Sequence, residues 1–325
     1  MFNKTILVTG ASGFIGCALV RSLCQRGYAV RATVRSAHAL ASMSEMRDRL
    51  RLKTLTIYNL GELSDKTDWR EVIESVDTVV HCAARAHILY ETSTNPLEEF
   101  RQMNTRVTAN LGAQAANQGV RRFIFLSSIG VLGHNSDSIP FTDNSVPNPQ
   151  VPYAQAKWEA EQSLHALPNA MDNIIIRPPV VYGPGVKGNF GKLINLVNKN
   201  IPLPFGAVKN RRQFIGIDNL VDFIMTCIEP VQTIHETFLV ADNEVISTTQ
   251  LLQSLSFAMG KKALLLPVPH KLLSWGLNSI GQSKLAGQLL GNLEIKSNNA
   301  KNMLNWNPPY TMHEQLLKLF NLIGI

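Results

Sequence analysis

Tyr153 and Lys157 stand four residues apart in the stretch "VPYAQAKWEAEQ", which follows a proline-rich loop. Four residues make about one helical turn, so the two side chains lie on the same face of a helix. A free phenol has a pKa of about 10, which is too high for a base at neutral pH. A nearby ammonium group favours the phenolate. The pair therefore predicts a tyrosine that exchanges a proton with a substrate hydroxyl or ketone.

A serine completes the set of side chains that this chemistry needs. The stretch "RRFIFLSSIGVLGH" ends an apolar strand with two serines, the second of which is Ser128. We expect Ser128 to hold the substrate oxygen whose proton Tyr153 moves, while a bound nicotinamide carries the hydride. A tyrosine and a lysine at this spacing are common in helices that have only a structural role. The hypothesis therefore depends on the elements around them.

The first of these elements is a glycine loop. The stretch "VTGASGFIG" places Gly10, Gly13 and Gly16 between an expected strand and an expected helix. A sharp turn needs residues without Cβ, and their absence lets the backbone approach a pyrophosphate closely. The N-terminus of the helix adds unpaired N–H groups and a partial positive charge. At the start of an alternating α/β pattern, this loop predicts dinucleotide binding.

The end of the second strand indicates which dinucleotide binds. An enzyme specific for NAD usually has an acidic residue there, which accepts hydrogen bonds from the ribose. Here the strand ends "ATVRS" with no carboxylate, and Arg35 could form a forked contact with a 2′-phosphate. The sequence favours NADP(H), and a surface arginine beside NAD(H) is the alternative.

The elements that hold these residues alternate in type. Short β-branched runs are separated by stretches whose apolar residues recur at three and four positions. This alternation predicts an α/β fold, a doubly wound parallel Rossmann sheet that binds ligands at the carboxyl ends of its strands. The expected strands are residues 5–9, 29–34, 52–58, 77–83, 122–128 and 173–177, with a late strand at 236–242.

The pattern changes after about residue 178, where proline and glycine concentrate and the remaining chain is mostly helical. We expect a smaller C-terminal lobe that the chain enters more than once. The prediction is a dinucleotide-binding domain of residues 1–178 and 214–242. A substrate-binding lobe would comprise residues 179–213 and 243–325.

The charge distribution has one local feature. The net charge is +7, which is moderate, and we do not expect nucleic-acid binding. No acidic residue lies between Asp172 and Asp218, so this segment is either a basic surface loop or a site for a multiply charged small anion. Its basic residues are Arg177, Lys187, Lys192, Lys199, Lys209, Arg211 and Arg212.

Other features point to a cytoplasmic protein with reduced cysteines. No apolar run is long enough for a membrane span, and we see no signal peptide. The cysteines lie far apart, without the spacing of a metal site. The amphipathic stretch "PHKLLSWGLNSIGQSKLAGQLL" is expected to form lobe core or an oligomer contact, rather than a membrane anchor. His81 is expected to be a satisfied buried histidine, and Asn104 either holds a water near Lys157 or packs a helix.

With these motifs placed, the chain resembles the extended short-chain dehydrogenase/reductase family, in its nucleotide-sugar epimerase/dehydratase group. The resemblance covers nearly the whole chain. It rests on "VTGASGFIG", "VVHCAA", "YAQAK", "RPPVVYGP", "RRQFIGIDNLVD" and "SNNAKNMLNWNPP".

The resemblance implies roles for particular residues. The catalytic residues would be Ser128, Tyr153 and Lys157. The cofactor would contact Gly10, Ser12, Gly13, Phe14, Ile15, Gly16, Arg35, Asn59, Leu60, Ala83, Ala84, Tyr153, Lys157 and Pro179. The substrate would contact His87, Ser128, Asn189 and Arg212, with Arg212 on the nucleotide diphosphate. The resemblance implies no metal. It implies a homodimer that forms through two helices of the sheet domain.

Departures from the family pattern narrow the reaction. Dehydratases of this group carry an Asp-Glu pair where this chain has Ile129 and Gly130, so the acid and base for dehydration are missing. Many epimerases have asparagine where this chain has Val180. The chain is most similar to UDP-N-acetylquinovosamine dehydrogenases, which are 4-ketoreductases of surface-polysaccharide synthesis. We therefore expect an NAD(P)-dependent 4-ketoreductase acting on a UDP-sugar. The alternatives are a UDP-hexose 4-epimerase with retained NAD and a non-catalytic dinucleotide sensor.

Overall fold

The computed structural model describes residues 4–86, 95–167, 171–229, 234–279, 281 and 283–320. Helices and strands alternate along the first half of the chain, as predicted. This half contains β1 (Thr5–Thr9), α1 (Phe14–Gln25), β2 (Ala29–Val34), α2 (Ala37–Arg49), β3 (Leu55–Asn59), α3 (Arg70–Ile73), β4 (Thr78–His81), α4 (Pro96–Phe100), the π-helix η1 (Arg101–Arg106), α5 (Val107–Asn117), β5 (Arg122–Leu126), the 3₁₀ turn η2 (Ile129–Val131), α6 (Pro152–His165) and β6 (Asp172–Arg177). The second half contains β7 (Val181–Tyr182), α7 (Gly188–Asn198), β8 (Ile215–Gly216), α8 (Ile217–Ile228), β9 (Glu236–Leu239), α9 (Thr248–Ala258), α10 (His270–Ser279), α11 (Ser283–Leu290), α12 (Asn299–Leu304) and α13 (Met312–Leu319).

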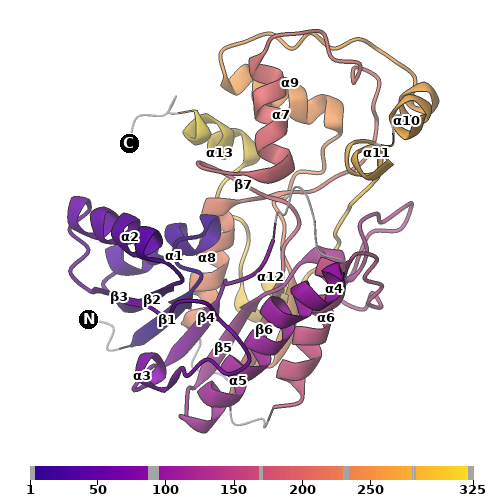
Figure 1. The fold of residues 1–325 in the computed structure, drawn as a ribbon. Coiled ribbons are helices and arrows are strands. Elements are labelled where there is room, and N and C mark those ends of the chain that lie inside the picture. The colour runs from indigo at the N-terminus through magenta and orange to yellow at the C-terminus, as the bar shows by residue number, and fades with distance from the viewer. Residues whose placement is uncertain are drawn as a thin grey trace. The chain divides into compact units, whose positions relative to one another are not determined.

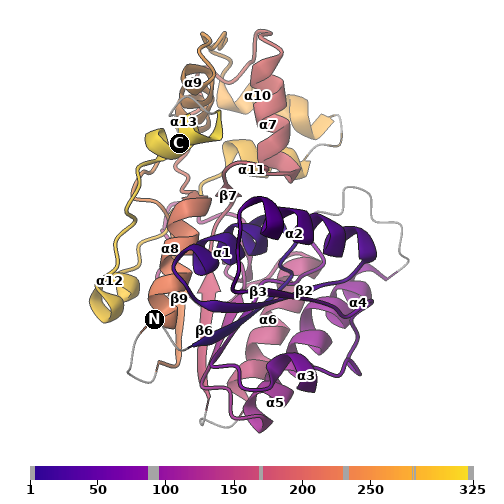
Figure 2. The same ribbon diagram turned by 90° about the vertical axis from the view of Figure 1, so that its left-hand side faces the viewer.

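The main sheet has the order β3-β2-β1-β4-β5-β6-β9 in the described part of the chain. The neighbours from β3 to β6 run parallel. Helices α1 and α2 cover one face and α5 and α6 the other (Figures 1 and 2). The predicted doubly wound α/β fold is confirmed.

The register of the sheet brings three strand ends to one edge. Thr9 of β1 is paired with His81 of β4, and His81 is paired with Phe125 of β5. The segments that follow these residues carry the glycine loop, the alanines after β4 and the two serines. The strands β4 and β5 are shorter than the apolar runs that predicted them, because the chain leaves the ladder at this edge while its residues remain buried.

The sheet is held to α5 and α6 by an apolar core. Each large apolar side chain buried there contributes about 1.5–3 kcal/mol relative to exposure. Its fully buried members include Trp69, Val107, Leu111, Phe123, Phe125 and Leu164. This packing fixes α6, which carries Tyr153 and Lys157, against the end of β5.

By its internal contacts the chain divides into two compact units. One contains Met1–Val131, Pro149–Arg177 and Val221–Phe238, and the other Leu132–Asn148, Pro178–Leu220 and Leu239–Ile325. The second unit has its own core, in which Phe190 stacks on Tyr182 at 5.3 Å and meets Phe214 edge-on at 6.0 Å. Which unit binds which ligand stays a prediction. None of the described helices is long and apolar enough to span a bilayer.

Candidate active site

The glycine loop leaves no room for side chains at its base. Gly10 has a φ of +65°, and a Cβ on it would lie 2.7 Å from the main chain of Ala83. A Cβ on Gly16 would lie 2.3 Å from the carbonyl oxygen of Gly10, and one on Gly13 would lie 3.1 Å from it. The sequence uses glycine here because β1, α1 and the segment after β4 approach one another closely. This is the cradle that a dinucleotide requires.

The tip of this loop faces solvent, where the N-terminus of α1 has no side-chain cap. Gly13 caps α1 and no side chain caps the helix. Ser12 and Gly13 are exposed, while Phe14 and Ile15 are half-buried in the first turn. The uncapped N–H groups and the helix dipole favour an anion such as a pyrophosphate. The residues present therefore fit the predicted cofactor.

The ends of β2 and β3 carry the residues predicted to contact the adenosine part of the cofactor. Arg35 is exposed, and its guanidinium makes a weak contact of 3.9 Å with the sulfur of Met103. The side-chain oxygen of Asn59 accepts a hydrogen bond from the N–H of Gly61, at 3.2 Å. Leu60 is half-buried beside the core. Arg35 is thus placed at the strand end without a carboxylate contact among those described.

The segment after β4 packs against the glycine loop. Ala83 is buried and its N–H donates to the hydroxyl of Thr9 at 3.3 Å, while Ala84 is half-buried. The small side chains of this segment would leave room for a flat ligand beside the glycine loop. His87 lies outside the described residues, so its substrate contact stays a prediction.

His81 is a satisfied core histidine, as expected. Its ring nitrogens lie 2.6 Å from the hydroxyl of Thr9 and 2.9 Å from that of Thr108. Thr108 donates its own proton to the carbonyl of Asn104, so it accepts from His81 Nε2. Burial lowers the pKa of His81 to about 3, which keeps the ring neutral.

Asn104, in the π-helix η1, clamps the chain that leaves β4. Its side-chain oxygen accepts from the N–H of Arg85 at 2.7 Å, and its amide donates to the carbonyl of Arg85 at 3.1 Å. Both polar atoms are thus used on one residue of the main chain. The amide fixes the path of the segment after Ala84 instead of only packing a helix.

The two serines at the end of β5 have different roles. Ser127 is buried and donates to the carboxylate of Glu161, which also forms an ion pair with the buried guanidinium of Arg177 at 2.5 Å. Ser128 is half-buried, and its hydroxyl oxygen accepts the N–H of Gly130 at 3.1 Å. Ser127 is therefore part of the scaffold, and Ser128 keeps a hydroxyl proton to donate to a ligand.

Gly130 gives the Ser128 hydroxyl its space. A Cβ on Gly130 would lie 3.3 Å from Ser128 Oγ and 3.6 Å from the Cβ of Ala154, the neighbour of Tyr153. The serine hydroxyl and the start of α6 thus lie on either side of one residue without a side chain. Any side chain at this position would press on that hydroxyl.

Lys157 is buried and anchored to the same strand end. Its ammonium donates to the carbonyl of Leu126 at 2.6 Å and lies 4.4 Å from the ring centre of Phe125. Burial lowers the pKa of Lys157 to about 8, although Cys82 and Glu161 oppose the shift. The structure therefore brings the lysine to the carboxyl end of β5, two residues before Ser128.

Tyr153 begins α6 and is half-buried, with its ring edge-on to Phe100 at 5.9 Å. The expectation that Lys157 lowers the pKa of this phenol is wrong for the protein alone. Burial raises the pKa of Tyr153 to about 12 instead. The reason is that loss of water dominates at the phenol, while the ammonium is directed to the carbonyl of Leu126.

In the second unit, neighbouring arginines have opposite environments. Arg211 is exposed and forms a two-pronged ion pair with Glu294, at 2.6 and 2.9 Å. Arg212 is buried and donates to the carbonyl of Gly291 at 3.0 Å, with no carboxylate contact in the described part of the chain. Burial lowers the pKa of Arg212 to about 10. A desolvated guanidinium without a counter-charge is suited to receive an anion.

The other residues predicted to bind ligands in this unit are less distinctive. Asn189 is exposed at the start of α7 and donates to Gln288 of α11 at 2.6 Å. Pro179 is buried in the loop between β6 and β7, and the following Val180 is exposed. Arg177, which the sequence grouped with a possible anion site, is instead neutralised by Glu161.

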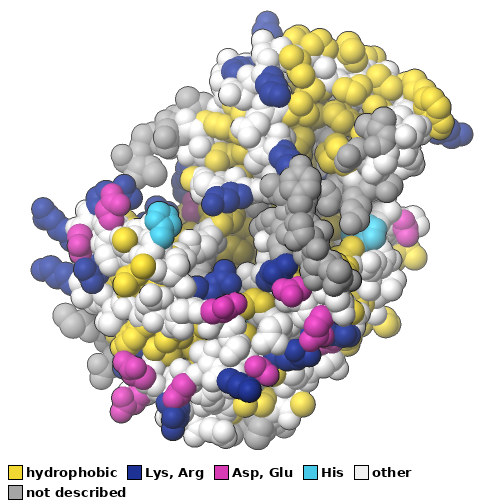
Figure 3. Space-filling model, viewed as in Figure 1, with side chains coloured by type: hydrophobic (Ala, Val, Ile, Leu, Met, Phe, Trp, Pro, Cys, Tyr) yellow, Lys and Arg dark blue, Asp and Glu magenta, His cyan; other side chains and the backbone are white. Residues whose placement is uncertain are grey.

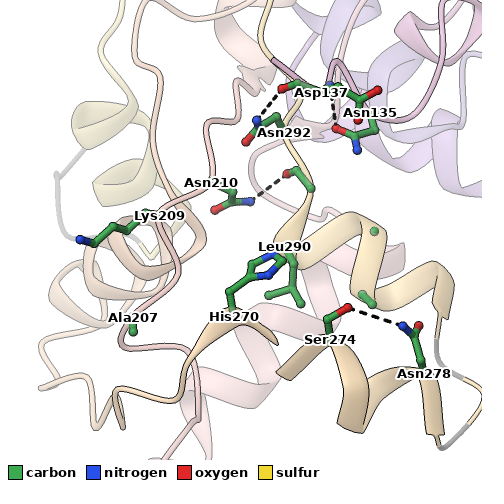
Figure 4. Close-up of a pocket in the computed structure, with 13 residues that line it drawn as sticks. Asn135, Asp137, Ala207, Lys209, Asn210, His270, Ser274, Asn278, Leu290 and Asn292 are labelled. Atoms are coloured by element: carbon green, nitrogen blue, oxygen red, sulfur yellow. Dashed lines mark hydrogen bonds between the residues drawn. The ribbon is translucent and has the colours of Figure 1, made fainter. Parts of the chain in front are cut away.

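An open pocket of about 680 Å³ lies within the second unit, between the segment around Asn210, helix α10 and helix α11 (Figure 4). Asn210 donates to the carbonyl of Gly291 at 2.9 Å, and Asn292 donates to that of Asp137 at 2.5 Å. Gly291 thus lines the pocket and also accepts the hydrogen bond of Arg212. Arg212 is not itself among the residues that line the pocket, and it is joined to them through the carbonyl of Gly291.

Sequence reasoning missed two buried carboxylates. Glu161 follows Lys157 by one helical turn on the buried face of α6, and an acidic residue there was the available signal. Asp242 accepts from Tyr182 at 2.7 Å and from Asn219 at 2.7 Å. Burial raises the pKa of Asp242 to about 6. No local sequence pattern predicts the hydrogen bonds of this carboxylate to Tyr182 and Asn219. Each carboxylate organises the scaffold of its own unit.

Comparison with known proteins gives a consistent result. The model of the NAD dependent epimerase/dehydratase family matches residues 6–241. The UDP-glucose 4-epimerase of Vibrio cholerae is 39% identical over 319 residues, which are 96% of this chain and 93% of the relative.

Solved structures share the fold over nearly the whole chain. The UDP-glucuronic acid 4-epimerase from Bacillus cereus, in complex with NAD, has a TM-score of 0.74 at 21% identity, covering 98% of this chain and 97% of its own. The UDP-glucose 4-epimerase with UDP-glucose from Thermotoga maritima has a TM-score of 0.73 at 22% identity, with the same coverage.

Proposed function

The chain belongs to the NAD dependent epimerase/dehydratase family, as the sequence indicated, and on that premise we propose that this enzyme is a UDP-sugar 4-epimerase with retained NAD. The observation that carries the proposal is the 39% identity to a 4-epimerase over almost the full length of both chains. The sequence alone favours a 4-ketoreductase. The similarity supports its alternative better.

The residues at the end of β5 and the start of α6 supply the proton chemistry. When bound, nicotinamide in its oxidised form supplies the hydride acceptor and a positive charge that favours the phenolate of Tyr153. Tyr153 takes the proton of the sugar 4-hydroxyl when C4 is oxidised, and it returns a proton to O4 after the 4-keto sugar has presented its opposite face. The bound cofactor would accept the hydride of C4 and give it back to the same carbon. Ser128 donates a hydrogen bond to O4, and Lys157 orients and polarises the site.

The second unit binds the nucleotide diphosphate of the substrate. Arg212 has no described carboxylate contact and donates to the carbonyl of Gly291, which lines the pocket between α10 and α11. We propose that its guanidinium pairs with the substrate diphosphate, with Lys209 on the pocket rim as a second cation. Asn189, His87 and Pro179 stay proposed contacts.

The cofactor choice is part of the proposal. The sequence favoured NADP(H) because of Arg35, whereas an epimerase that retains its cofactor is served by NAD. The exposed position of Arg35 and its weak thioether contact suit a surface arginine beside NAD. The nucleotide that copurifies with the protein, identified by mass, tests this point directly.

Two parallel incubations test the reaction. UDP-glucose and UDP-N-acetylglucosamine without added cofactor should give their 4-epimers with no net change in absorbance at about 340 nm. UDP-4-keto-6-deoxy-N-acetylglucosamine with NADPH should show no steady oxidation of the reductant. Steady oxidation there, without epimer formation, would replace the epimerase with the ketoreductase. Tight NAD binding without either turnover would indicate the dinucleotide sensor.

Assembly and setting are proposed from family resemblance alone. We propose a homodimer through two helices of the sheet-containing unit, in the cytoplasm, serving surface-polysaccharide synthesis. Sedimentation equilibrium of the purified protein tests the dimer.

A further inference from the structure

A long part of the second unit carries no negative charge. Between Glu244 and Glu294 the sequence has no acidic residue, while it contains Lys261, Lys262, Lys271 and Lys284. This segment includes α9, α10 and α11. It also includes the amphipathic stretch that the sequence analysis singled out. One side of α10 lines the pocket described above, and the other side has no assigned role.

Helix α10 presents different side chains to its different surroundings. His270, Ser274 and Asn278, spaced one turn apart, line the pocket described above (Figure 4). Leu273 is buried in the core of the unit. These contacts account for the inner half of the helix and hold it in place.

The remaining face of α10 is apolar and exposed. Leu272 is 56% exposed and Trp275 is 69% exposed, one turn apart on the helix. The segment that leads into α10 adds Leu264 and Leu266, at 47% and 53% exposed. In Figure 3 hydrophobic side chains gather over α10 and over the loop that precedes it. We call Leu264, Leu266, Leu272 and Trp275 the α10 apolar face.

Positive charges border this face. Lys262 and Lys271 are exposed and make no ion pair with the described residues. Asp137 lines the pocket on the other side of α10. An exposed tryptophan and leucines bordered by unpaired lysines are typical of a surface that lies in the interfacial region of an anionic bilayer.

We propose that the α10 apolar face docks this protein on the surface of an anionic phospholipid bilayer as a peripheral contact. A second copy of the chain is a poorer occupant. A two-fold contact through this face would gather the lysines of both copies at one interface, and the segment between Glu244 and Glu294 has no acidic residue to pair with them. A bilayer surface receives the apolar side chains and neutralises the lysines together. The docking does not depend on which sugar the enzyme converts.

Vesicle flotation tests the proposal with the full-length protein. Vesicles of equal parts phosphatidylglycerol and phosphatidylcholine should bind the protein at least about tenfold more strongly than pure phosphatidylcholine vesicles. Binding should fall about fivefold for each of Lys262→Gln and Lys271→Gln, and should weaken in high salt. Emission of Trp275 should be quenched by brominated lipid.

Variants locate the contact. The double variant Leu272→Ser, Trp275→Ser should lose at least about tenfold in vesicle binding, with an unchanged far-ultraviolet circular dichroism spectrum. Val146→Ser, at a residue 81% exposed outside this segment, is the matched control and should bind as the wild type. Absence of binding to phosphatidylglycerol vesicles, or equal binding by the double variant, overturns the proposal. The proposal is also overturned if the wild type is a dimer, the double variant is a monomer, and vesicles bind neither protein. That result would show that the α10 apolar face is a contact between two copies of the chain.

Discussion

The ammonium group of Lys157 donates a 2.6 Å hydrogen bond to the main-chain carbonyl of Leu126, the last residue of β5. This contact joins the active-site helix to the strand end that leads to Ser128. The ring of Phe125 covers the same ammonium from another side, at 4.4 Å. The lysine therefore holds together the two segments that carry the proposed catalytic residues, in addition to any electrostatic effect on the phenol.

Replacing Tyr153 with phenylalanine should remove the proton carrier and keep the fold. We expect turnover to fall by about 10²–10⁴-fold, because general acid–base catalysis supplies about that factor. Cofactor binding should change little, since the glycine loop is untouched. Tyr310→Phe, at an exposed tyrosine of the second unit, is the control. Assays of kcat together with NAD content decide it, and a Tyr153→Phe rate near that of the wild type would exclude the proton role.

The adjacent serines should separate catalysis from stability. Ser128→Ala should lower kcat with little change in thermal stability, because its hydroxyl faces a half-buried site. Ser127→Ala should lower the free energy of unfolding by about 1.5–3 kcal/mol, because it removes a buried hydrogen bond to a carboxylate. Urea unfolding and initial rates on both variants measure the split. The reverse pattern would show that Ser127 is the catalytic hydroxyl.

The neighbouring arginines offer a matched pair for substrate binding. Arg212→Gln should raise the KM for the UDP-sugar about 10- to 100-fold, because a charge-assisted contact to the diphosphate is lost. Arg211→Gln should leave the KM within about twofold, since Arg211 is paired with Glu294 at the surface. Steady-state kinetics and isothermal titration with UDP measure both effects. Equal effects of the two substitutions would remove Arg212 from the nucleotide site.

Burial of Lys157 should make stability depend on pH in alkaline solution. In the unfolded chain its pKa is that of a free lysine, 10.5, whereas in the folded protein burial lowers it to about 8. Between these values the unfolded state holds more protons, so this residue makes the free energy of unfolding rise as pH rises. The rise is on the order of 3 kcal/mol over the whole window.

Urea unfolding at intervals across that window measures the effect in the wild type and in Lys157→Met, which should lack the rise. The exposed Lys301 provides the control variant Lys301→Met, whose curve should follow the wild type. Parallel curves for all three proteins would show that the Lys157 ammonium is not desolvated.

Much of the fold was predictable because its signals are local. The apolar run before Gly10 and the run before Arg35 give β1 and β2 at their predicted bounds. The strands β4 and β5 end earlier than predicted, because burial continues past the last ladder pair and hydrophobicity alone does not mark where pairing stops. The glycine cradle was also predictable, since its steric reason lies within a few residues.

The sequence identified candidate residues for the site, but it did not predict their pKa values or their buried partners. Sequence spacing identified Tyr153 and Lys157, whereas the raised pKa of the phenol depends on burial and on the carbonyl that engages the lysine. Glu161 was missed because its partners lie in other elements, Ser127 directly after β5 and Arg177 at the end of β6. Such contacts arise from tertiary packing, which no local pattern encodes.

The contrast between Ser127 and Ser128 constrains how this enzyme can change. The Ser127 hydroxyl donates to the carboxylate of Glu161, whereas the Ser128 hydroxyl accepts from the N–H of Gly130, so the two hydroxyls have different surroundings. Insertion or deletion of a single residue between Leu126 and Ser128 would exchange a scaffold hydroxyl for a reactive one. We therefore expect that the number of residues between Leu126 and Ser128 tolerates less variation than their side chains do. Engineering of this segment should succeed by substitution and fail by insertion or deletion.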